Sequence, residues 1–289
     1  MSRWNLKQKP ELSILIPAHN EEAGLARLLP EIDQLLAGWS DRPVTEIILI
    51  DDGSTDDTAT VVSQLQLSHT TIKYYRQAMR RGQSTALALA VDKAKGEWLA
   101  TLDADGQNDP ADLPRLWDVA MQGNFQAVLG WRQNRQDNRR TRWVSRVANR
   151  IRNRVLGQAI IDTGCSTRLM LAVEVVQLPI FEGWHRFLGP MLLARGCQIA
   201  QLPVHHRPRS HGKSHYNWKN RGLRVLTDLF GVAWLNRRMI QFGNNEKRLV
   251  KANTRIDHVR SIHTAGHLSI FAEEIQADSS NIEYQAHSA

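Results

Sequence analysis

The sequence predicts an α/β protein with a mostly parallel sheet and helices on both faces of that sheet. Short apolar segments typical of buried strands alternate with longer segments of helical periodicity, and polar clusters follow several of the strands. The predicted strands are 12–17, 46–51, 72–75, 97–103, 127–130 and 199–204. The predicted helices are 21–36, a helix through 61–65, 82–95, 110–123, 139–156 and a helix near 185–195.

Local signals support each early element. Residues 12–17 (LSILIP) form an apolar strand that ends at a proline, and 46–51 (EIILID) is a second one. Residues 21–36 place Leu25, Leu28 and Ile32 on one side of a helix. The turn at 52–56 offers an N-cap for the next helix, and Pro110 suits the first turn of the helix over 110–123.

Composition limits the functional classes. The chain has 289 residues, 42% of them hydrophobic, which is enough for one large domain with a real core. Two cysteines, Cys165 and Cys197, give no disulfide framework and favour a reducing compartment. We find no signal peptide at the N-terminus and no apolar run long enough to span a bilayer. We therefore expect a cytoplasmic protein without a transmembrane span.

The net charge of +8 requires an explanation. Nine arginines and a single acid, Asp137, lie between Arg132 and Arg154. Nucleic acid, an anionic membrane and a phosphorylated substrate would each suit this charge, and so would a solvated helix face. A nucleic-acid-binding protein would be expected to interleave stacking aromatics with the basic residues. Trp131 and Trp143 are too few for that, so we expect no nucleic-acid partner.

Polar clusters follow three predicted strands: residues 17–21 (PAHNE), 51–54 (DDGS) and 103–105 (DAD). The carboxyl ends of parallel strands share one edge of a sheet, so these clusters should converge on a ligand crevice. Asp103 and Asp105 offer the hard oxygen ligands that Mg²⁺ or Mn²⁺ prefers, with nucleotide phosphates completing the shell. The chain contains neither the dinucleotide fingerprint nor the Walker phosphate loop, so we predict a different kind of nucleotide site.

The segment 205–216 (HHRPRSHGKSHY) is strongly cationic. Its histidines could suggest zinc, but no helical His pair or cysteine pair accompanies them. Its arginines, lysine and glycine are more typical of a loop that grips phosphate.

With these residues in view, the chain resembles the family-2 glycosyltransferases, in particular the dolichyl-phosphate mannosyltransferase and polyprenyl-phosphate glycosyltransferase branch. The resemblance runs from about Glu11 to Tyr216. It rests on motifs in the family's order: PAHNE, DDGSTD, RGQSTAL, DADGQNDP, DTGCSTR and RPRSHGKSHY. It implies a GT-A type, Rossmann-like catalytic domain over 1–216.

The resemblance also assigns roles to residues by position. It implies that Pro17, His19 and Glu21 line the nucleotide base and that Asp52 accepts hydrogen bonds from base or ribose. It places Asp103, Asp105 and Gln107 at the metal, with Asp103 also near the nucleotide. It implies that Arg132 and Arg209 hold phosphates with Arg142 and Ser145 as their companions, and Arg207 is a further substrate-binding residue. The loop with Lys213 and Ser214 would close over donor or acceptor.

The implied reaction is inverting transfer of a hexose from GDP-mannose or a UDP-hexose to a polyprenyl phosphate. A hydroxyl acceptor would need a general base, whereas a phosphate monoester is already largely dianionic at neutral pH. The chain is rich in cations and shows no dedicated base, which favours the phosphate. A family-2 enzyme acting on a hydroxyl acceptor is the alternative, although its later acidic motif and Q-x-x-R-W are absent. A sugar-phosphate nucleotidyltransferase would need a Gly-rich loop after the first strand.

We divide the rest of the chain in two. Residues 217–242 read as amphipathic helices for a membrane interface, in which Trp218, Phe230 and Trp234 accompany several basic residues. Residues 243–289 are of mixed charge with weak periodicity, and we expect a poorly ordered tail. The membrane surface is thus an expected partner, and a membrane partner subunit or a homo-oligomer is compatible with the sequence.

Overall fold

The computed structural model describes residues 10–133, 150–157, 160–208, 218–238, 273–278 and 281–285. Its centre is a sheet in the order β7-β5-β6-β4-β1-β2-β3-β8-β9. The strands are β1 (Leu12–Ala18), β2 (Thr45–Asp51), β3 (Thr71–Arg76), β4 (Trp98–Thr101), β5 (Ala127–Arg132), β6 (Arg168–Leu171), β7 (Ile199–Val204), β8 (Glu273–Asp278) and β9 (Asn281–Gln285). The helices are α1 (Glu22–Gly38), α2 (Thr58–Gln64), α3 (Gln83–Lys93), η1 (Pro110–Asp112), α4 (Leu113–Gln122), α6 (Ala172–Val175), η2 (Trp184–Arg186), α7 (Leu188–Ala194) and α8 (Trp218–Arg238), and residues 150–156 are also helical.

The predicted strands and helices of the first 130 residues are all present, with ends shifted by a few residues. Strand β1 lies parallel to β2 and β4, and β2 lies parallel to β3. Strand β6 is antiparallel to both β4 and β5, whereas β5 and β7 are parallel. The mostly parallel α/β sheet predicted from the sequence is confirmed, and the carboxyl ends of β1, β2 and β4 share one edge.

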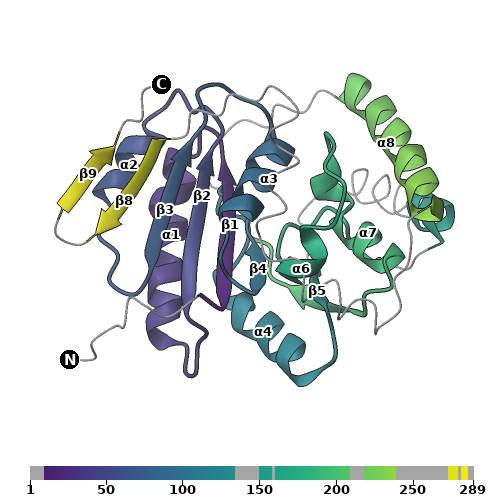
Figure 1. Ribbon diagram of the computed structural model, residues 1–289, viewed down its shortest axis with the longest axis horizontal. Coiled ribbons are helices and arrows are strands. Elements are labelled where there is room, and N and C mark those ends of the chain that lie inside the picture. Colours follow the sequence, from purple (N-terminus) through teal and green to yellow (C-terminus); the bar gives the residue numbers. More distant parts are fainter. Residues whose placement is uncertain are drawn as a thin grey trace.

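Both faces of the sheet are covered, as the alternation of side chains along a strand requires. On β1, Ile14 and Ile16 belong to the core formed with α1, α2 and α4, whereas Leu15 belongs to the opposite core, formed with α3, α7 and α8. The predicted apolar side of α1, with Leu25, Leu28, Leu29, Ile32 and Leu36, is fully buried. Figure 1 shows the sheet between these helices.

Helix α1 packs directly against the backbone of the loop that follows β4. A Cβ atom on Gly24 of α1 would lie 2.2 Å from the carbonyl oxygen of Ala104 and 3.1 Å from the Cα of Asp105. Real Cβ atoms do not come this close to backbone atoms, so only glycine lets α1 pack there. The contact fixes the position of the backbone that carries the two predicted metal-binding carboxylates.

The end of the chain contains two strands that the sequence did not indicate. Strand β8 pairs antiparallel with β3, from Arg76↔Glu273 to Lys73↔Gln276, and β9 pairs antiparallel with β8. We expected a poorly ordered tail over 243–289, and most of that segment lies outside the described residues. A strand that pairs along the open edge of β3 satisfies backbone groups there, and such pairing depends little on side-chain periodicity.

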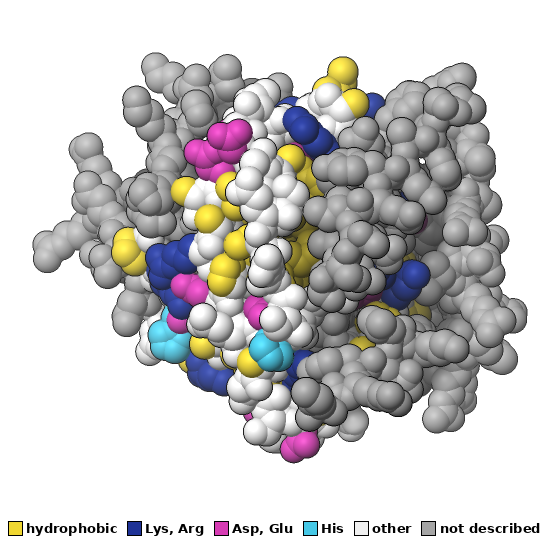
Figure 2. All heavy atoms as spheres, turned by 90° about the vertical axis from the view of Figure 1, so that its left-hand side faces the viewer, with side chains coloured by type: hydrophobic (Ala, Val, Ile, Leu, Met, Phe, Trp, Pro, Cys, Tyr) yellow, Lys and Arg dark blue, Asp and Glu magenta, His cyan; other side chains and the backbone are white. Residues whose placement is uncertain are grey.

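Helix α8 and the β8–β9 hairpin lie at opposite ends of the molecule (Figure 1). Figure 2 faces the hairpin side, where acidic, basic and histidine side chains lie interspersed with hydrophobic ones on the described surface. In the described part of the chain, no helix combines the length and hydropathy that a membrane crossing would need.

Replacing Gly24 by alanine should destabilise the protein by several kcal/mol, because the new Cβ must displace the backbone at Ala104 and Asp105. Thermal unfolding of Gly24→Ala against wild type measures this. Gly38→Ala is the matched control, since a Cβ there meets nothing within 4 Å in the same helix. Equal unfolding temperatures for the two variants would contradict the close-packing account.

Candidate functional site at the carboxyl edge of the sheet

The loops after β1 and β2 are tied together by hydrogen bonds. The Nδ1 atom of His19 lies 2.9 Å from the carbonyl oxygen of Asp52. The backbone N–H of Asn20 donates to the Ser54 hydroxyl at 2.9 Å, and the Asn20 side chain accepts from the N–H of Thr55 at 2.8 Å. Asn20 has a φ of 54°, a left-handed conformation that asparagine tolerates. The two polar clusters predicted to converge at this edge are therefore in direct contact.

Asp52 fixes the loop that leads into α3. Its Oδ1 accepts from the N–H of Arg81 at 2.6 Å and its Oδ2 from the N–H of Gly82 at 2.7 Å. The side chain is buried, and Gly82, with a φ of 95°, immediately precedes α3. The contacts seen here are with the protein backbone, so the expected contact of Asp52 with base or ribose stays a prediction.

Asp103 sits in a polar frame at the end of β4. Its Oδ1 accepts from the Gln83 side chain at 3.0 Å, and its Oδ2 accepts from the Ser166 hydroxyl at 2.6 Å. Its backbone N–H donates to Asn108, which also accepts from Ser166 and donates to Thr167. Gln83 begins α3 and Ser166 precedes β6, so residues far apart in sequence orient one carboxylate.

Asp105 acts on Asp103 through its charge. Burial and the nearby Asp105 carboxylate raise the pKa of Asp103, and the hydrogen bond from Ser166 and the charges of Arg168 and Arg132 partly offset that rise. A cation near both carboxylates would remove the repulsion between them. Asp105 also accepts from the N–H of Gln107 at 3.0 Å, which closes a tight turn.

The donor atoms at this edge fit a hard divalent cation in part. Two carboxylates and the amide oxygen of Gln107 supply oxygen ligands, and the hydrogen bond that the Gln107 amide nitrogen donates to the Arg207 carbonyl at 3.3 Å does not use that oxygen. Among the described residues, no three His, Cys, Asp or Glu side chains form a metal-binding group. The remaining ligands would have to come from substrate phosphates and water, as is usual for Mg²⁺.

Arg132 is held by a carboxylate of the protein. Its Nε and Nη2 atoms donate to the two oxygens of Asp162 at 2.7 and 3.0 Å, a bidentate pair with both side chains largely buried. Gly164 lies against this guanidinium, since a Cβ there would come within 2.8 Å of Nη2. Asp162 thus orients Arg132 close to Asp103, while contact of Arg132 with phosphate stays a prediction.

Arg207, like Arg132, is bound by carboxylates of the protein itself. Its guanidinium donates to Glu31 of α1 at 2.5 Å and to Asp109 at 2.9 Å, and its backbone N–H donates to Gln107. Partial burial by itself would raise the pKa of Glu31. Hydrogen bonds from Arg27 and Arg207 outweigh that effect, so the pKa of Glu31 is lowered. These contacts anchor the start of the cationic segment 205–216 beside the Asp103–Asp109 loop.

Pro17, His19 and Glu21 lie partly exposed at the carboxyl end of β1, and their contact with a nucleotide base stays a prediction. The predicted residues Arg142, Ser145, Arg209, Lys213 and Ser214 lie outside the described residues. The described structure thus brings together the clusters at 17–21, 52–54 and 103–107 with Arg132 and Arg207 at their margin.

The comparisons with known proteins agree with this geometry. Residues 13–173, more than half of the chain, match the family described as glycosyl transferase family 2. The chain belongs to glycosyltransferase family 2. The matched residues include the loops described above up to β6. The protein is therefore a glycosyltransferase, and its fold is of the GT-A type.

Two curated relatives are each 32% identical to this glycosyltransferase. One is a dodecaprenyl-phosphate galacturonate synthase of Rhizobium johnstonii, matched over 80% of this chain and 68% of its own length. Another is an undecaprenyl-phosphate 4-deoxy-4-formamido-L-arabinose transferase of Pseudomonas savastanoi pv. phaseolicola, matched over 71% of this chain and 60% of its own. The family-2 chain therefore spans about two thirds of the length of these relatives.

Solved structures with the same fold include glucosyl-3-phosphoglycerate synthase from Mycobacterium tuberculosis. One, in complex with Mn²⁺, uridine-diphosphate-glucose and phosphoglyceric acid, superimposes with a TM-score of 0.60 at 20% identity and covers 78% of this glycosyltransferase and 80% of that chain. At this identity the likeness concerns the fold, which the sheet order and covering helices already indicate.

Several site residues of the glycosyltransferase had no role in the sequence interpretation. Gln83, Asn108, Ser166 and Arg168 all lie within motifs that were noted, but only the structure shows that three of them hold Asp103. Arg168 is buried and donates to the carbonyls of His185 and Thr163, at 2.6 and 2.9 Å. Burial lowers its pKa, and the charges of nearby acidic groups, Asp103 among them, offset part of that shift.

Gln77 is a further residue that no sequence signal indicated. It follows β3 directly, and its backbone N–H donates to the Asp51 carbonyl at 2.8 Å. Its side chain is 4% exposed, and neither amide atom has a hydrogen-bond partner among the described residues. A buried amide without partners is costly, so the Gln77 side chain lowers the stability of the folded protein.

Arg207→Met should lower stability at neutral pH by about 1 to 2 kcal/mol, because it removes two hydrogen-bonded ion pairs. The pKa of Glu31 is lowered in the folded state, so this contribution is present above the usual pKa and lost as pH falls through the folded-state value. The free energy of unfolding of the variant should therefore fall less steeply than that of wild type as the pH is lowered. Lys93→Met on α3, which removes an exposed pair with Asp92 and does not involve Glu31, is the control. Weaker donor binding with unchanged stability would instead assign Arg207 to the substrate.

Gln77→Leu should raise stability by about 1 kcal/mol, since it replaces a buried amide without partners by an apolar side chain of similar size. Thermal unfolding of both proteins, with and without a nucleoside diphosphate, measures the change and any loss of ligand-dependent stabilisation. Gln64→Leu at the exposed end of α2 is the control and should stay within about 0.5 kcal/mol of wild type. A less stable Gln77 variant would show that the amide is satisfied in the folded protein.

Proposed function

We propose that this glycosyltransferase moves a sugar from a nucleoside diphosphate sugar to a polyprenyl phosphate, with inversion at the anomeric carbon. The observation that carries the proposal is the pair Asp103 and Asp105 at the end of β4, with Asp103 oriented by Gln83 and Ser166. The names of the two curated relatives, both of which refer to prenyl phosphates, support the acceptor.

The donor in this proposal is GDP-mannose or a UDP-hexose. The names of the two relatives refer to galacturonate and to 4-deoxy-4-formamido-L-arabinose, so a test of the donor has to include sugars of these kinds. In the proposed complex, Pro17, His19 and Glu21 line the base at the end of β1. The loop that Asp52 holds, at Arg81 and Gly82, is the neighbouring wall.

The proposed reaction is a single in-line displacement. A phosphate oxygen of the acceptor attacks the anomeric carbon, the bond from that carbon to the diphosphate oxygen breaks, and the nucleoside diphosphate leaves. The acceptor is largely dianionic at neutral pH, because the second pKa of a phosphate monoester is about 6. No protein base has to remove a proton, so the two carboxylates of the site are left to bind the cation.

Mg²⁺ or Mn²⁺ would be held by Asp103, Asp105 and Gln107 together with donor phosphates. When bound, such a cation stabilises the negative charge that develops on the leaving diphosphate. The protein's own contribution is orientation: Gln83 and Ser166 fix the Asp103 carboxylate, and Asp162 fixes the guanidinium of Arg132 nearby. Arg132, Arg142, Ser145 and Arg209 are proposed to hold phosphate groups, and the loop with Lys213 and Ser214 to cover them.

The test is a transfer assay with the full chain, prenyl phosphate dispersed in detergent, Mn²⁺ or Mg²⁺, and radiolabelled GDP- and UDP-sugars that include a hexuronic acid and an amino-pentose. Metal-dependent label in an acid-labile, organic-soluble product is the expected result. Label that stays in water with every donor would refute the lipid acceptor and favour a soluble or polysaccharide hydroxyl. A product with the donor's anomeric configuration would refute the single displacement.

Asp105→Asn should lower turnover in this assay by about a hundredfold, the scale on which a lost electrostatic contact to a developing charge acts. The amide keeps the size of the side chain, so the fold should be retained, which circular dichroism checks. Asp118→Asn on the exposed side of α4 is the matched control and should leave turnover unchanged. Undiminished turnover in Asp105→Asn would remove this carboxylate from the site.

A further inference from the structure

The short helix η2 is tied to the first turn of α3, beside the residue that orients Asp103. The hydroxyl oxygen of Ser84 accepts from the N–H of Gly183 at 2.8 Å, and the Ser84 carbonyl accepts from the indole N–H of Trp184 at 2.9 Å. Gln83, which precedes Ser84 in the chain, donates to Asp103 at 3.0 Å. The turn that contains η2 therefore lies at the carboxyl edge of the sheet, next to the candidate site.

His185 is fixed in this turn at two points. Its carbonyl accepts from the buried Arg168 at the start of β6 at 2.6 Å, and its ring Nδ1 lies 2.7 Å from the Ser84 hydroxyl oxygen. The preceding residue, Trp184, is buried in the core that includes α3 and α7. The His185 side chain itself is partly exposed. A ring that is anchored in this way and still reaches the surface can contact a ligand without a change of conformation.

The hydrogen bonds of Ser84 decide which nitrogen of the His185 ring carries the proton. Ser84 is 7% exposed, and its hydroxyl oxygen already accepts from Gly183, so its O–H needs an acceptor. Within the described part of the chain, the acceptor that this O–H meets is Nδ1 of His185. A neutral imidazole has one donor and one acceptor nitrogen, so the proton is on Nε2. In this form the ring offers a hydrogen-bond donor and is no base for a hydroxyl acceptor.

The sheet order places this donor away from the nucleotide-base end of the proposed site. Strand β4, which leads to Asp103, lies between β1 and β6. The residues proposed to line the base follow β1 and β2, whereas Arg168, which binds the His185 carbonyl, begins β6. In Figure 1, α7, which follows η2 in the chain, likewise lies on the other side of β4 from β1 and β2. The His185 ring is thus anchored on the side of Asp103 that is left for the sugar and the acceptor.

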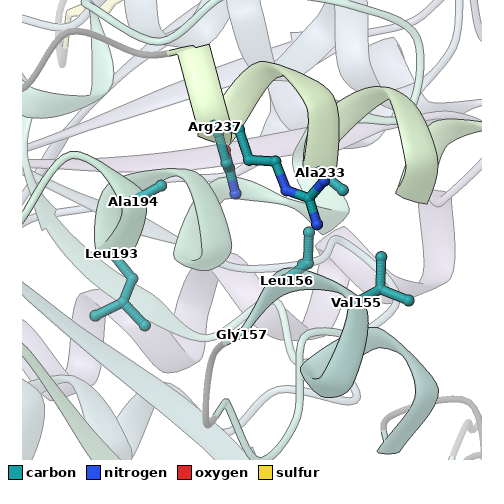
Figure 3. A pocket seen from close by; sticks show the side chains of 8 residues that line it. Val155, Leu156, Gly157, Leu193, Ala194, Ala233 and Arg237 are labelled. Atoms are coloured by element: carbon teal, nitrogen blue, oxygen red, sulfur yellow. The ribbon is translucent and has the colours of Figure 1, made fainter.

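A separate pocket of about 320 Å³ lies between α7, α8 and residues 155–157 (Figure 3). None of the residues that line it belongs to η2 or to α3. The His185 ring is therefore a feature of the carboxyl edge and not of this pocket, and a ligand that meets the ring is a ligand of the candidate active site.

We propose that the Nε2–H of His185 donates a hydrogen bond to a phosphate oxygen of the acceptor. This inference rests on the proposed function in one respect, namely that the acceptor is a phosphate monoester. The attacking phosphate is largely a dianion at neutral pH, so it needs a donor that orients it towards the anomeric carbon and no group that removes a proton. The ring keeps its proton throughout, and the Ser84 hydroxyl fixes both the position of the ring and its tautomer.

Two substitutions at His185 separate this role from a purely structural one. His185→Asn keeps an acceptor near the place of Nδ1, so the contact with Ser84 is retained, but it has no group at the place of Nε2. The longer His185→Gln variant can put an amide N–H near the place of Nε2. In the transfer assay with the full chain and detergent-dispersed prenyl phosphate, His185→Asn should lower kcat/KM for the prenyl phosphate about thirtyfold, the scale of one hydrogen bond to a charged oxygen. His185→Gln should recover most of that loss, and KM for the nucleotide sugar should stay as in wild type.

His69→Asn is the matched control, because the His69 ring is also bound through Nδ1, to Asp33 of α1 at 3.1 Å, and lies before β3 at the opposite edge of the sheet. It should leave kcat/KM for the prenyl phosphate unchanged. Circular dichroism and thermal unfolding show whether each variant is folded.

Four results would overturn the proposal. Wild-type turnover in His185→Asn would remove the ring from the reaction. An equal loss in the Asn and Gln variants would contradict the donor role, because an amide replaces a donor but not a base. A loss that appears in the KM of the nucleotide sugar would assign the ring to the donor substrate. Wild-type protein that transfers sugar to no prenyl phosphate would refute the proposed function and this role with it, whereas the first three results are obtained with active wild-type protein and refute this role alone.

Discussion

The hydrogen bonds of two aspartates organise the edge of the sheet on which the site depends. Asp52 binds two successive backbone N–H groups and so sets where α3 begins. The first residue of α3, Gln83, then donates to Asp103 at the end of another strand. Because the chain between these contacts is a glycine-containing turn, small changes at Asp52 would be transmitted to the carboxylate that faces the donor phosphates in the proposed reaction.

Buried charge is the second constraint on this edge. Burial and repulsion from Asp105 raise the pKa of Asp103, and the protein offsets this with a hydroxyl donor and two arginines. Asp162 in turn holds Arg132 in a bidentate pair. An ion pair of this kind gives orientation more surely than stability, because desolvation cancels much of its attraction. The site thus contains both carboxylates and guanidinium groups. In the proposed complex, a cation would balance the carboxylates and the donor phosphates would contact the arginines.

The two ends of the molecule differ in how their surface is covered. At the hairpin end, β8 adds to β3 through backbone pairing, which covers an open sheet edge. At the other end, α8 buries one face against the core and leaves two aromatic residues exposed. The same chain thus covers one sheet edge by backbone pairing and leaves two aromatic side chains of α8 exposed.

The sequence by itself determined the α/β class and nearly every element of the first 130 residues. The reason is that buried parallel strands are continuous apolar runs and covering helices have a strict apolar period, so local pattern and tertiary environment agree. It also located the clusters at 17–21, 51–54 and 103–105, since parallel strands always bring their carboxyl ends to one edge. The family motifs extended this to residue roles, most of which concern ligands.

Only the tertiary structure decided which side chains meet. Gln83, Asn108 and Ser166 surround Asp103 although they are up to 83 positions apart, and no local pattern encodes that proximity. The resemblance assigned Arg132 and Arg207 to the substrate, yet the structure shows that Asp162, Glu31 and Asp109 bind them. The partner of an arginine depends on the fold and not on its neighbours in the chain. The pairing of β8 with β3 likewise arises from contacts between distant segments, which periodicity cannot indicate.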